Sequence, residues 1–197
     1  MATDINPGVV GYAANKSDTS HVTLQQANAQ ELPFDNSSFD LVLCQFGVMF
    51  FPDKVLANTE ARRVLRDGGH YLVVTFADLA ANPVPKAADE AVEALFPDDP
   101  PRYMERGPFS YANPAAVEAD LRSAGFSAVS VETLTLMSSV NARDAAAGMV
   151  LGSPFRAEIE RRDPDSLQRA LDAVTAALEP LDGHEAPISA HVATARR

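Results

Sequence analysis

The sequence predicts an α/β protein in which a mostly parallel sheet has helices on both faces. Short runs rich in β-branched and aromatic residues alternate with helical patterns along the chain. Two of these runs, residues 40–46 and 70–77, are almost continuously apolar, as in strands that are buried on both faces. The 197 residues, 46% of them apolar, suffice for one such domain, and we expect residues 1–197 to form it.

The first elements form a strand–helix–strand unit. Residues 2–5 have the pattern of a strand end, and Asn6-Pro7 is a helix N-cap followed by proline at the first helical position. The next strand covers residues 21–26, and a loop with turn-forming residues at 35–38 follows it.

Two longer strands enclose a helix in the middle of the chain. Residues 40–46 are the first of these strands, and residues 70–77 are the second. Between them, residues 53–66 carry helical periodicity, and Gly68-Gly69 is expected to end that helix.

An insertion at about 78–112 interrupts this alternation of strands and helices. It contains six prolines and one helical pattern, at residues 86–96. Connections of this length that follow a central strand are usually functional, so we expect a lid-like segment. Regular elements resume after it: a helix from Asn113-Pro114 to Gly125, a strand at 127–137, helices at 141–151 and from Asp163, and a closing strand at 187–194.

Composition limits the partners and the compartment. The net charge of −11 argues against nucleic acid or an anionic membrane as partner. No apolar stretch approaches the ~20 residues of a membrane span, and no secretory signal precedes the first strand. Cys44, the single cysteine, lies in an apolar run and is interpreted as a buried strand residue. We therefore expect a cytoplasmic protein.

Four segments carry a more specific signal when they are taken in order. They are Asn28-Ala-Gln-Glu-Leu-Pro-Phe34, Ser38-Phe-Asp-Leu-Val42, Gln45-Phe-Gly-Val-Met-Phe-Phe-Pro-Asp53 and Glu60-Ala-Arg-Arg-Val-Leu-Arg-Asp-Gly-Gly69. Together with Asp4 at the end of the first strand, they resemble the class I S-adenosylmethionine-dependent methyltransferases, in the small-molecule branch that includes the ubiquinone-biosynthesis enzymes. The resemblance is close over residues 1–77 and implies a Rossmann-like sheet, S-adenosylmethionine as cofactor and a small-molecule methyl acceptor.

The resemblance also implies roles for particular residues. Asp4 would bind the ribose hydroxyls, and Ile5 would pack on the adenine. Asn28 stands where the family usually has Asp, and its oxygen would accept from the adenine amino group. Ala29 would offer its backbone amide to the adenine ring, and Gln45 would face the methionine part of the cofactor.

The family's glycine loop is not found in this sequence. Members carry a strand and a Gly-x-Gly-x-Gly loop that approaches the methionine carboxylate and opens a helix. Here the adjacent glycines, Gly68-Gly69, belong to a later turn, and the chain opens where the family's second strand ends. We therefore expect the family's sheet order, 3-2-1-4-5-7-6, without its first strand and the glycine-loop helix, as in an N-terminally truncated chain.

Candidates for the acceptor site are less specific. Phe46, Met49 and Phe50 would line the methyl-transfer pocket, although core packing explains each equally well. Tyr103, Glu105 and Tyr111 lie in the lid-like segment and are candidates for substrate contact. His21, His70, His184 and His191 lack metal-ligand spacing, and no catalytic base or metal ligand is assigned.

Two other functions remain open on the sequence. One is a non-catalytic, methyltransferase-like binding module, which the missing glycine loop favours. The other is a nicotinamide-dependent oxidoreductase, because an acid after a strand also serves that fold, although the dinucleotide fingerprint is missing too. The acceptor, the methylated atom and the oligomeric state are not specified by the sequence.

Overall fold

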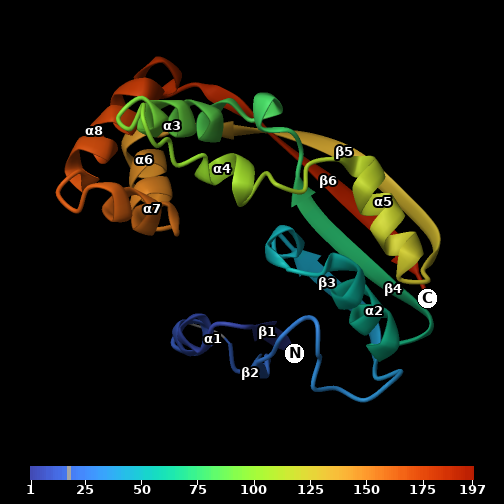
Figure 1. The fold of residues 1–197 in the computed structure, drawn as a ribbon. Coiled ribbons are helices and arrows are strands. Elements are labelled where there is room, and N and C mark those ends of the chain that lie inside the picture. The colour runs from blue at the N-terminus through green and yellow to red at the C-terminus, as the bar shows by residue number, and fades with distance from the viewer. Residues whose placement is uncertain (17–18) are drawn as a thin grey trace.

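The chain forms two separate sheets in a computed structural model that describes residues 1–16 and 19–197 (Figure 1). The small sheet pairs β1 (Ala2–Asp4) in parallel with β2 (Leu24–Gln26). The larger sheet has the order β3 (Phe39–Gln45), β4 (Leu65–Phe76), β6 (Glu185–Arg196) and β5 (Ser127–Ser139). β3 and β4 are parallel, and β6 is antiparallel to both of its neighbours. The predicted α/β class is confirmed.

The helices begin at the caps that the sequence predicts in several places. Asn6, Asp53, Asn113 and Asn141 all cap helices through their side-chain oxygens. The α-helices are α1 (Pro7–Ala14), α2 (Lys54–Val64), α3 (Pro83–Glu93), α4 (Tyr103–Arg106), α5 (Pro114–Ser123), α6 (Ala142–Val150), α7 (Phe155–Arg162) and α8 (Leu167–Leu178). Short 3-10 turns lie at Val48–Phe50, Leu79–Ala81 and Glu179–Leu181.

The strand order agrees with the predicted family order once its first strand is left out. That order then becomes 3-2 and 4-5-7-6, which corresponds to β2-β1 and β3-β4-β6-β5. Within residues 1–16 and 19–197, β1 pairs only with β2, and β3 pairs only with β4. β1 and β3 are therefore both edge strands, each with one row of unpaired backbone groups.

One face of the larger sheet is buried and the other is largely open. α2 and α5 pack on the buried face, where Tyr71, Val73 and Ala193 contribute to a core. On the opposite face, Leu41 and Leu43 of β3 are 59% and 54% exposed. The expectation that this strand is buried on both faces is therefore wrong, because no element of the described chain packs on that side of it.

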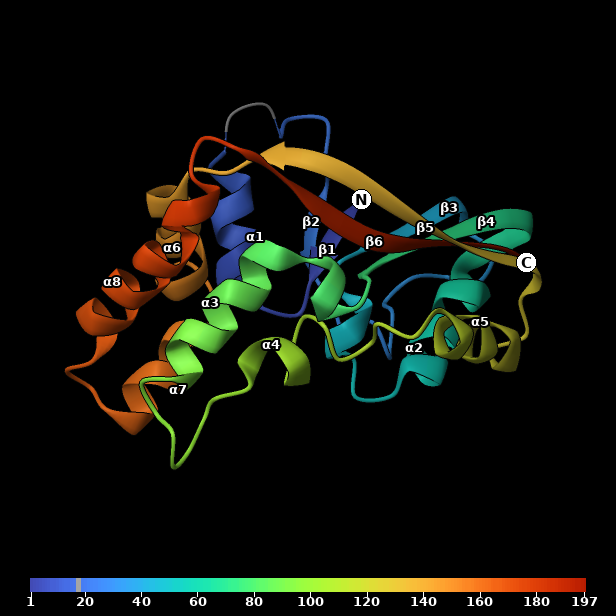
Figure 2. The same ribbon diagram turned by 90° about the horizontal axis from the view of Figure 1, so that it is seen from above.

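A second core lies at the far end of the larger sheet. α3, α6, α7 and α8 gather there, beyond the ends of β5 and β6 (Figure 2). Ala88 and Val92 of α3 are fully buried against this group, and Phe155 and Val174 are buried with them. The segment 78–112 therefore belongs mainly to this helical cluster.

Several predicted boundaries are corrected by the structure. The strand predicted at 21–26 is limited to Leu24–Gln26. The helix predicted at 53–66 ends at Val64, and β4 starts at the next residue, so Gly68-Gly69 lies inside a strand with an irregular register instead of ending a helix. α7 was not predicted, and the helix expected from Asp163 begins at Leu167.

Candidate functional site

The carboxyl ends of β1 and β2 place Asp4 beside the Asn28 loop. Asp4 pairs with Gln26 in the sheet, and its carbonyl accepts from the Ala27 amide at 3.0 Å. One Asp4 carboxylate oxygen accepts from the Asn6 amide at 2.7 Å, and the other has no partner within the described residues. The two positions expected to meet at a nucleoside are thus on adjacent strand ends, and Ile5 is exposed next to them.

A tight turn shapes the loop that follows β2. The Asn28 side-chain oxygen accepts from the Gln30 amide at 3.0 Å, and the Asn28 carbonyl accepts from the Glu31 amide at 3.0 Å. The Ala29 amide donates to no acceptor in the described part of the chain. An amide oxygen has two lone pairs, so Asn28 keeps one acceptor position and Ala29 keeps one donor.

An ion pair on α2 holds this loop. Glu60 and Arg63 are 2.7 Å apart, and their hydrogen bond lowers the pKa of the Glu60 carboxyl. Glu60 accepts from the Leu32 amide at 2.9 Å, while Arg63 donates to the carbonyls of Leu32 and Phe34, each at 2.8 Å. The spacing of these segments therefore has a structural basis, because Glu60 and Arg63 of one segment bind the backbone of the other.

A further hydrogen bond connects the small sheet to the segment after β3. The Gln30 side-chain oxygen accepts from the Asp53 amide at 3.0 Å. Gln30 follows the carboxyl end of β2, and Asp53 lies eight residues after the end of β3 at Gln45. The segments that follow these two strands therefore meet, and Gln45 is exposed at the end of β3.

The residue after Gln45 has an unusual backbone. Phe46 has φ of 53°, and its amide donates to the Val74 carbonyl at 2.9 Å. A left-handed conformation at a non-glycine residue costs on the order of 1–3 kcal/mol and persists only where its surroundings enforce it. The Phe46 ring stacks on Phe76 with centroids 4.4 Å apart, and Phe76 stacks on Phe109 at 4.8 Å.

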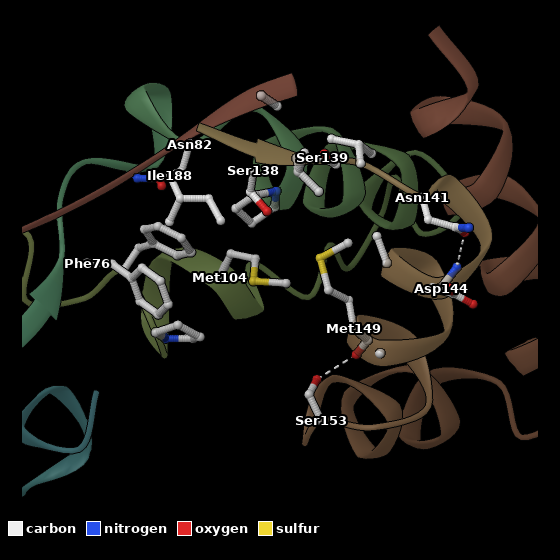
Figure 3. A pocket seen from close by; sticks show the side chains of 18 of the residues that line it. Phe76, Asn82, Met104, Ser138, Ser139, Asn141, Asp144, Met149, Ser153 and Ile188 are labelled. Carbon is white, nitrogen blue, oxygen red and sulfur yellow. Dashed lines mark hydrogen bonds between the residues drawn. The ribbon is translucent and has the colours of Figure 1, made fainter. Parts of the chain in front are cut away.

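An apolar cavity begins at this aromatic stack. It has a volume of about 500 Å³ and lies between the ends of β4, β5 and β6 on one side and α3, α4 and α6 on the other (Figure 3). Phe76 and Phe109 line it, and Met104 and Met149 enter it from α4 and α6. Its other lining residues include Asn82, Val84, Pro85, Tyr103, Ser138, Ser139, Val140, Asn141, Asp144, Ala145, Gly148, Ser153, Ala186 and Ile188.

The polar groups of the cavity wall are mostly engaged with the protein. Asn82 donates to the carbonyls of Asp78 and Ser189 and accepts from the Ser189 amide. Ser153 donates to the Met149 carbonyl at 2.6 Å. None of the described residues that line the cavity is basic, and the single acid, Asp144, is exposed. The cavity is thus chemically suited to an uncharged, largely apolar molecule.

The structure places the predicted acceptor-site residues in three different surroundings. Tyr103 lines the cavity and stacks on Phe155 at 5.0 Å. Tyr111 is buried elsewhere and donates to Asp120 at 2.7 Å, and burial raises the pKa of its phenol. Met49 belongs to the first core, whereas Glu105 and Phe50 are exposed and lie outside the cavity lining.

Cys44 and His191 have structural surroundings. Cys44 is half-buried against the first core, and burial raises the pKa of its thiol. The two His191 ring nitrogens lie 2.8 Å from the Ala112 carbonyl oxygen and 2.9 Å from the Thr133 hydroxyl oxygen. Because a carbonyl only accepts, Nε2 is the donor to Ala112, and the ring is held between these two partners. No helix in the described part of the chain is long and apolar enough to span a membrane.

Sequence reasoning missed Met104, Phe109 and Met149 as cavity residues. Apolar side chains in helical patterns are equally typical of a core, so their types alone gave no signal. The small residues of α6, including Ala145 and Gly148, were the available sign, because they leave space beside the helix.

Comparison with known proteins finds similarity to methyltransferases. Residues 1–73 match the model of the family described as "Methyltransferase domain". The chain is 32% identical over 140 residues to a ubiquinone/menaquinone biosynthesis C-methyltransferase, UbiE, of Rhizobium etli, over 64% of this chain and 54% of the relative.

The chain is therefore similar to class I methyltransferases, and the match to the domain model lies in residues 1–73.

Other similar proteins agree. The UbiE protein of Klebsiella pneumoniae is 28% identical over 148 residues, covering 68% of this chain and 59% of its own. The chain spans little more than half the length of these curated relatives. The YcgJ protein of Bacillus subtilis has a similar fold, with a TM-score of 0.55 at 18% identity, over 99% of this chain and 80% of that protein.

A structure with bound cofactor has the same fold. Phosphoethanolamine N-methyltransferase 2 of Haemonchus contortus, solved in complex with S-adenosyl-L-methionine, has a TM-score of 0.54 at 17% identity. The similarity covers 99% of this chain and 42% of that one. At this level of identity the comparison shows the shared fold.

Proposed function

We propose that this chain binds S-adenosylmethionine at the carboxyl ends of β1, β2 and β3 and transfers its methyl group to an uncharged, largely apolar small molecule. The observation that carries the proposal is the aromatic stack of Phe46, Phe76 and Phe109. It joins the end of β3, where Gln45 lies, to the apolar cavity.

The residues present fit the nucleoside half of the cofactor. Asp4 offers a carboxylate oxygen for ribose hydroxyls, Asn28 an acceptor and Ala29 an amide donor, and exposed Ile5 offers an apolar surface for adenine. Gln45 would contact the methionine part. No Gly-x-Gly-x-Gly loop for the methionine carboxylate occurs in the sequence, so this part of the cofactor is held less completely.

The chemistry requires alignment more than acid–base catalysis. The cofactor supplies an activated methyl group, and proximity and orientation supply most of the acceleration. The apolar cavity wall would exclude water and orient the acceptor, with the segment 78–112 acting as the lid that contributes Met104 and Phe109. A quinone-ring acceptor, as in the names of the UbiE relatives, is one uncharged molecule of this kind. A cytoplasmic location stays a prediction from composition.

Calorimetric titration of S-adenosylmethionine into the full chain tests the cofactor site. We expect micromolar binding, weakened about tenfold or more by Asp4→Ala, because hydrogen bonds to a charged group are lost. Asp67→Ala is the matched control, since Asp67 is an exposed acid near the amino end of β4. If Asp4→Ala binds S-adenosylmethionine as tightly as wild type does, the cofactor does not bind at Asp4.

The missing glycine loop favours a second candidate, a non-catalytic methyltransferase-like binding module. The same titration separates the two functions. If the wild-type chain shows no heat of binding at millimolar cofactor, the module is favoured and the enzyme proposal fails.

A further inference from the structure

Asp89 is a buried acid that lies behind the wall of the apolar cavity. It belongs to α3, its exposed fraction is 4%, and it does not itself line the cavity. Its carboxylate accepts from the backbone amide of Met104 at 3.3 Å. Met104 is equally buried and points into the cavity from α4.

The Met104 backbone is fixed on both sides. Its amide donates to Asp89, and its carbonyl accepts from the Phe109 amide at 2.9 Å. Phe109 is the outer ring of the aromatic stack, and Tyr103 is the residue before Met104. Three lining side chains, Tyr103, Met104 and Phe109, therefore depend on the position of this one backbone unit.

The segment leading into α4 is also held by contacts to α7. Arg162 of α7 donates to the Asp99 carbonyl at 2.6 Å and pairs with the Asp99 carboxylate at 3.0 Å. Between that anchor and Met104 stands Arg102, which has a left-handed φ of 47°. The Asp89 hydrogen bond is thus a polar link between α3 and the part of the wall that carries the methionine, in addition to the apolar packing of Ala88 and Val92 in the same core.

We propose that Asp89 is a positioning residue of the cavity, which sets the place of Met104 and its neighbours through the hydrogen bond to the Met104 amide. The inference rests on the proposed function of the cavity as the acceptor site. It assigns Asp89 no contact with cofactor or acceptor, and its effect reaches the ligand only through α4.

Because the Asp89 carboxyl can ionise, the position of the Met104 backbone depends on pH. Burial, followed by the nearby acids Glu93 and Glu105 on α3 and α4 and by Glu90, raises the Asp89 pKa to about 6. Above that pH the ionised carboxylate is the stronger acceptor for the Met104 amide. Below it the protonated group accepts more weakly, so the wall is held less firmly.

Nuclear magnetic resonance of the full chain, with labelled amides and methionine methyl groups, tests the link. We expect the Met104 amide and methyl signals to titrate with a midpoint near pH 6 in wild type and to stay constant in Asp89→Asn. Met49 belongs to the other core and serves as the internal control. Glu93→Gln should keep the titration but move its midpoint down, because Glu93 raises the Asp89 pKa.

Binding of an uncharged apolar dye, N-phenyl-1-naphthylamine, gives the functional readout. We expect wild-type affinity to fall by roughly fivefold between pH 7.5 and 5. Asp89→Asn should bind at the weaker level at both pH values, since it keeps an acceptor oxygen without the charge. Gly148→Leu identifies dye bound in the cavity, because an added side chain at this lining position meets open space.

The outcomes are distinct from those of the cofactor titration. Met104 signals that do not move near pH 6, or that move identically in Asp89→Asn, would overturn the inference. Dye binding that is lost in Gly148→Leu but has the same pH profile in wild type and Asp89→Asn would overturn it too. Neither experiment involves methyl transfer, so loss of the proposed enzyme activity would leave both readouts intact.

Discussion

At the scale of single residues, buried polar groups in this protein are placed by specific partners. Asn82 uses both ends of its amide to bind Ser189 of β6, and His191 bridges Ala112 and Thr133. Asp89 differs from them because it is charged at neutral pH and has one weak backbone donor at 3.3 Å. It is therefore the residue at which stability should depend most clearly on pH.

We expect Asp89→Asn to stabilise the protein more at pH 8 than at pH 4. The folded-state pKa of about 6 lies above the ordinary value of 3.8, so folding favours the protonated form. In wild type, the stability that the protonated Asp89 carboxyl contributes is fully present below pH 3.8. This contribution is lost as pH rises through 6. The loss corresponds to about 3 kcal/mol at most, from 1.36 kcal/mol per pKa unit.

Thermal unfolding of wild type and variant at both pH values measures this difference. Glu160→Gln is a suitable control, because Glu160 is an exposed partner of Arg156. A melting-temperature difference that is the same at pH 4 and pH 8 would contradict the prediction.

At the scale of elements, the sequence predicted helix starts better than strand environments. Asn6 and Asn113 were recognisable as caps because capping is a local interaction between neighbours in sequence. The exposure of β3 was not recognisable, since an apolar run is identical whether or not another element covers it. The start of β4 was also missed, because Gly68-Gly69 has the composition of a helix end but lies within a strand.

The candidate site also combines features that follow from local sequence with features that depend on distant parts of the chain. Asp4 and Asn28 follow strands, so their meeting at one sheet edge follows from parallel pairing. The cavity depends on how α3, α4 and α6 pack at the far end of β5, which involves contacts between distant parts of the chain. Such packing is not encoded in the local pattern around Met104 or Met149.

The open face of β3 leads to a prediction about association. Leu41 and Leu43 are exposed on an edge strand, and such strands pair with other chains. We expect Leu43→Lys to reduce self-association of the isolated chain, measured by sedimentation velocity over a concentration series. Leu56→Lys is the matched control, because Leu56 is an exposed leucine on α2. Equal association of both variants and wild type would show that this face is not responsible.

At the scale of the whole molecule, the two sheets differ in how firmly they are held. β4 and β6 lie inside a four-stranded sheet and contribute to the first core. β1 and β2 have three residues each, and α1 contains no buried residue. The small sheet is joined to the rest through the loop that Glu60 and Arg63 hold.

Hydrogen exchange followed by mass spectrometry should reveal this difference. We expect the amides of residues 2–14 to exchange orders of magnitude faster than those of β4 and β6, because local opening exposes little apolar surface. Addition of S-adenosylmethionine should slow exchange in residues 2–6 and 27–31 if the proposed cofactor site is correct. Uniform protection across both sheets would contradict the two-part description.

The place of β6 in the sheet also governs how the chain acquires its structure on the ribosome. Within residues 1–16 and 19–197, β5 has no strand partner other than β6, which begins 46 residues after β5 ends. Until β6 emerges from the exit tunnel, β4 has only β3 as neighbour and the backbone of β5 has no strand partner. The nascent polypeptide therefore completes its main sheet late, and in that interval it is a natural client for a chaperone.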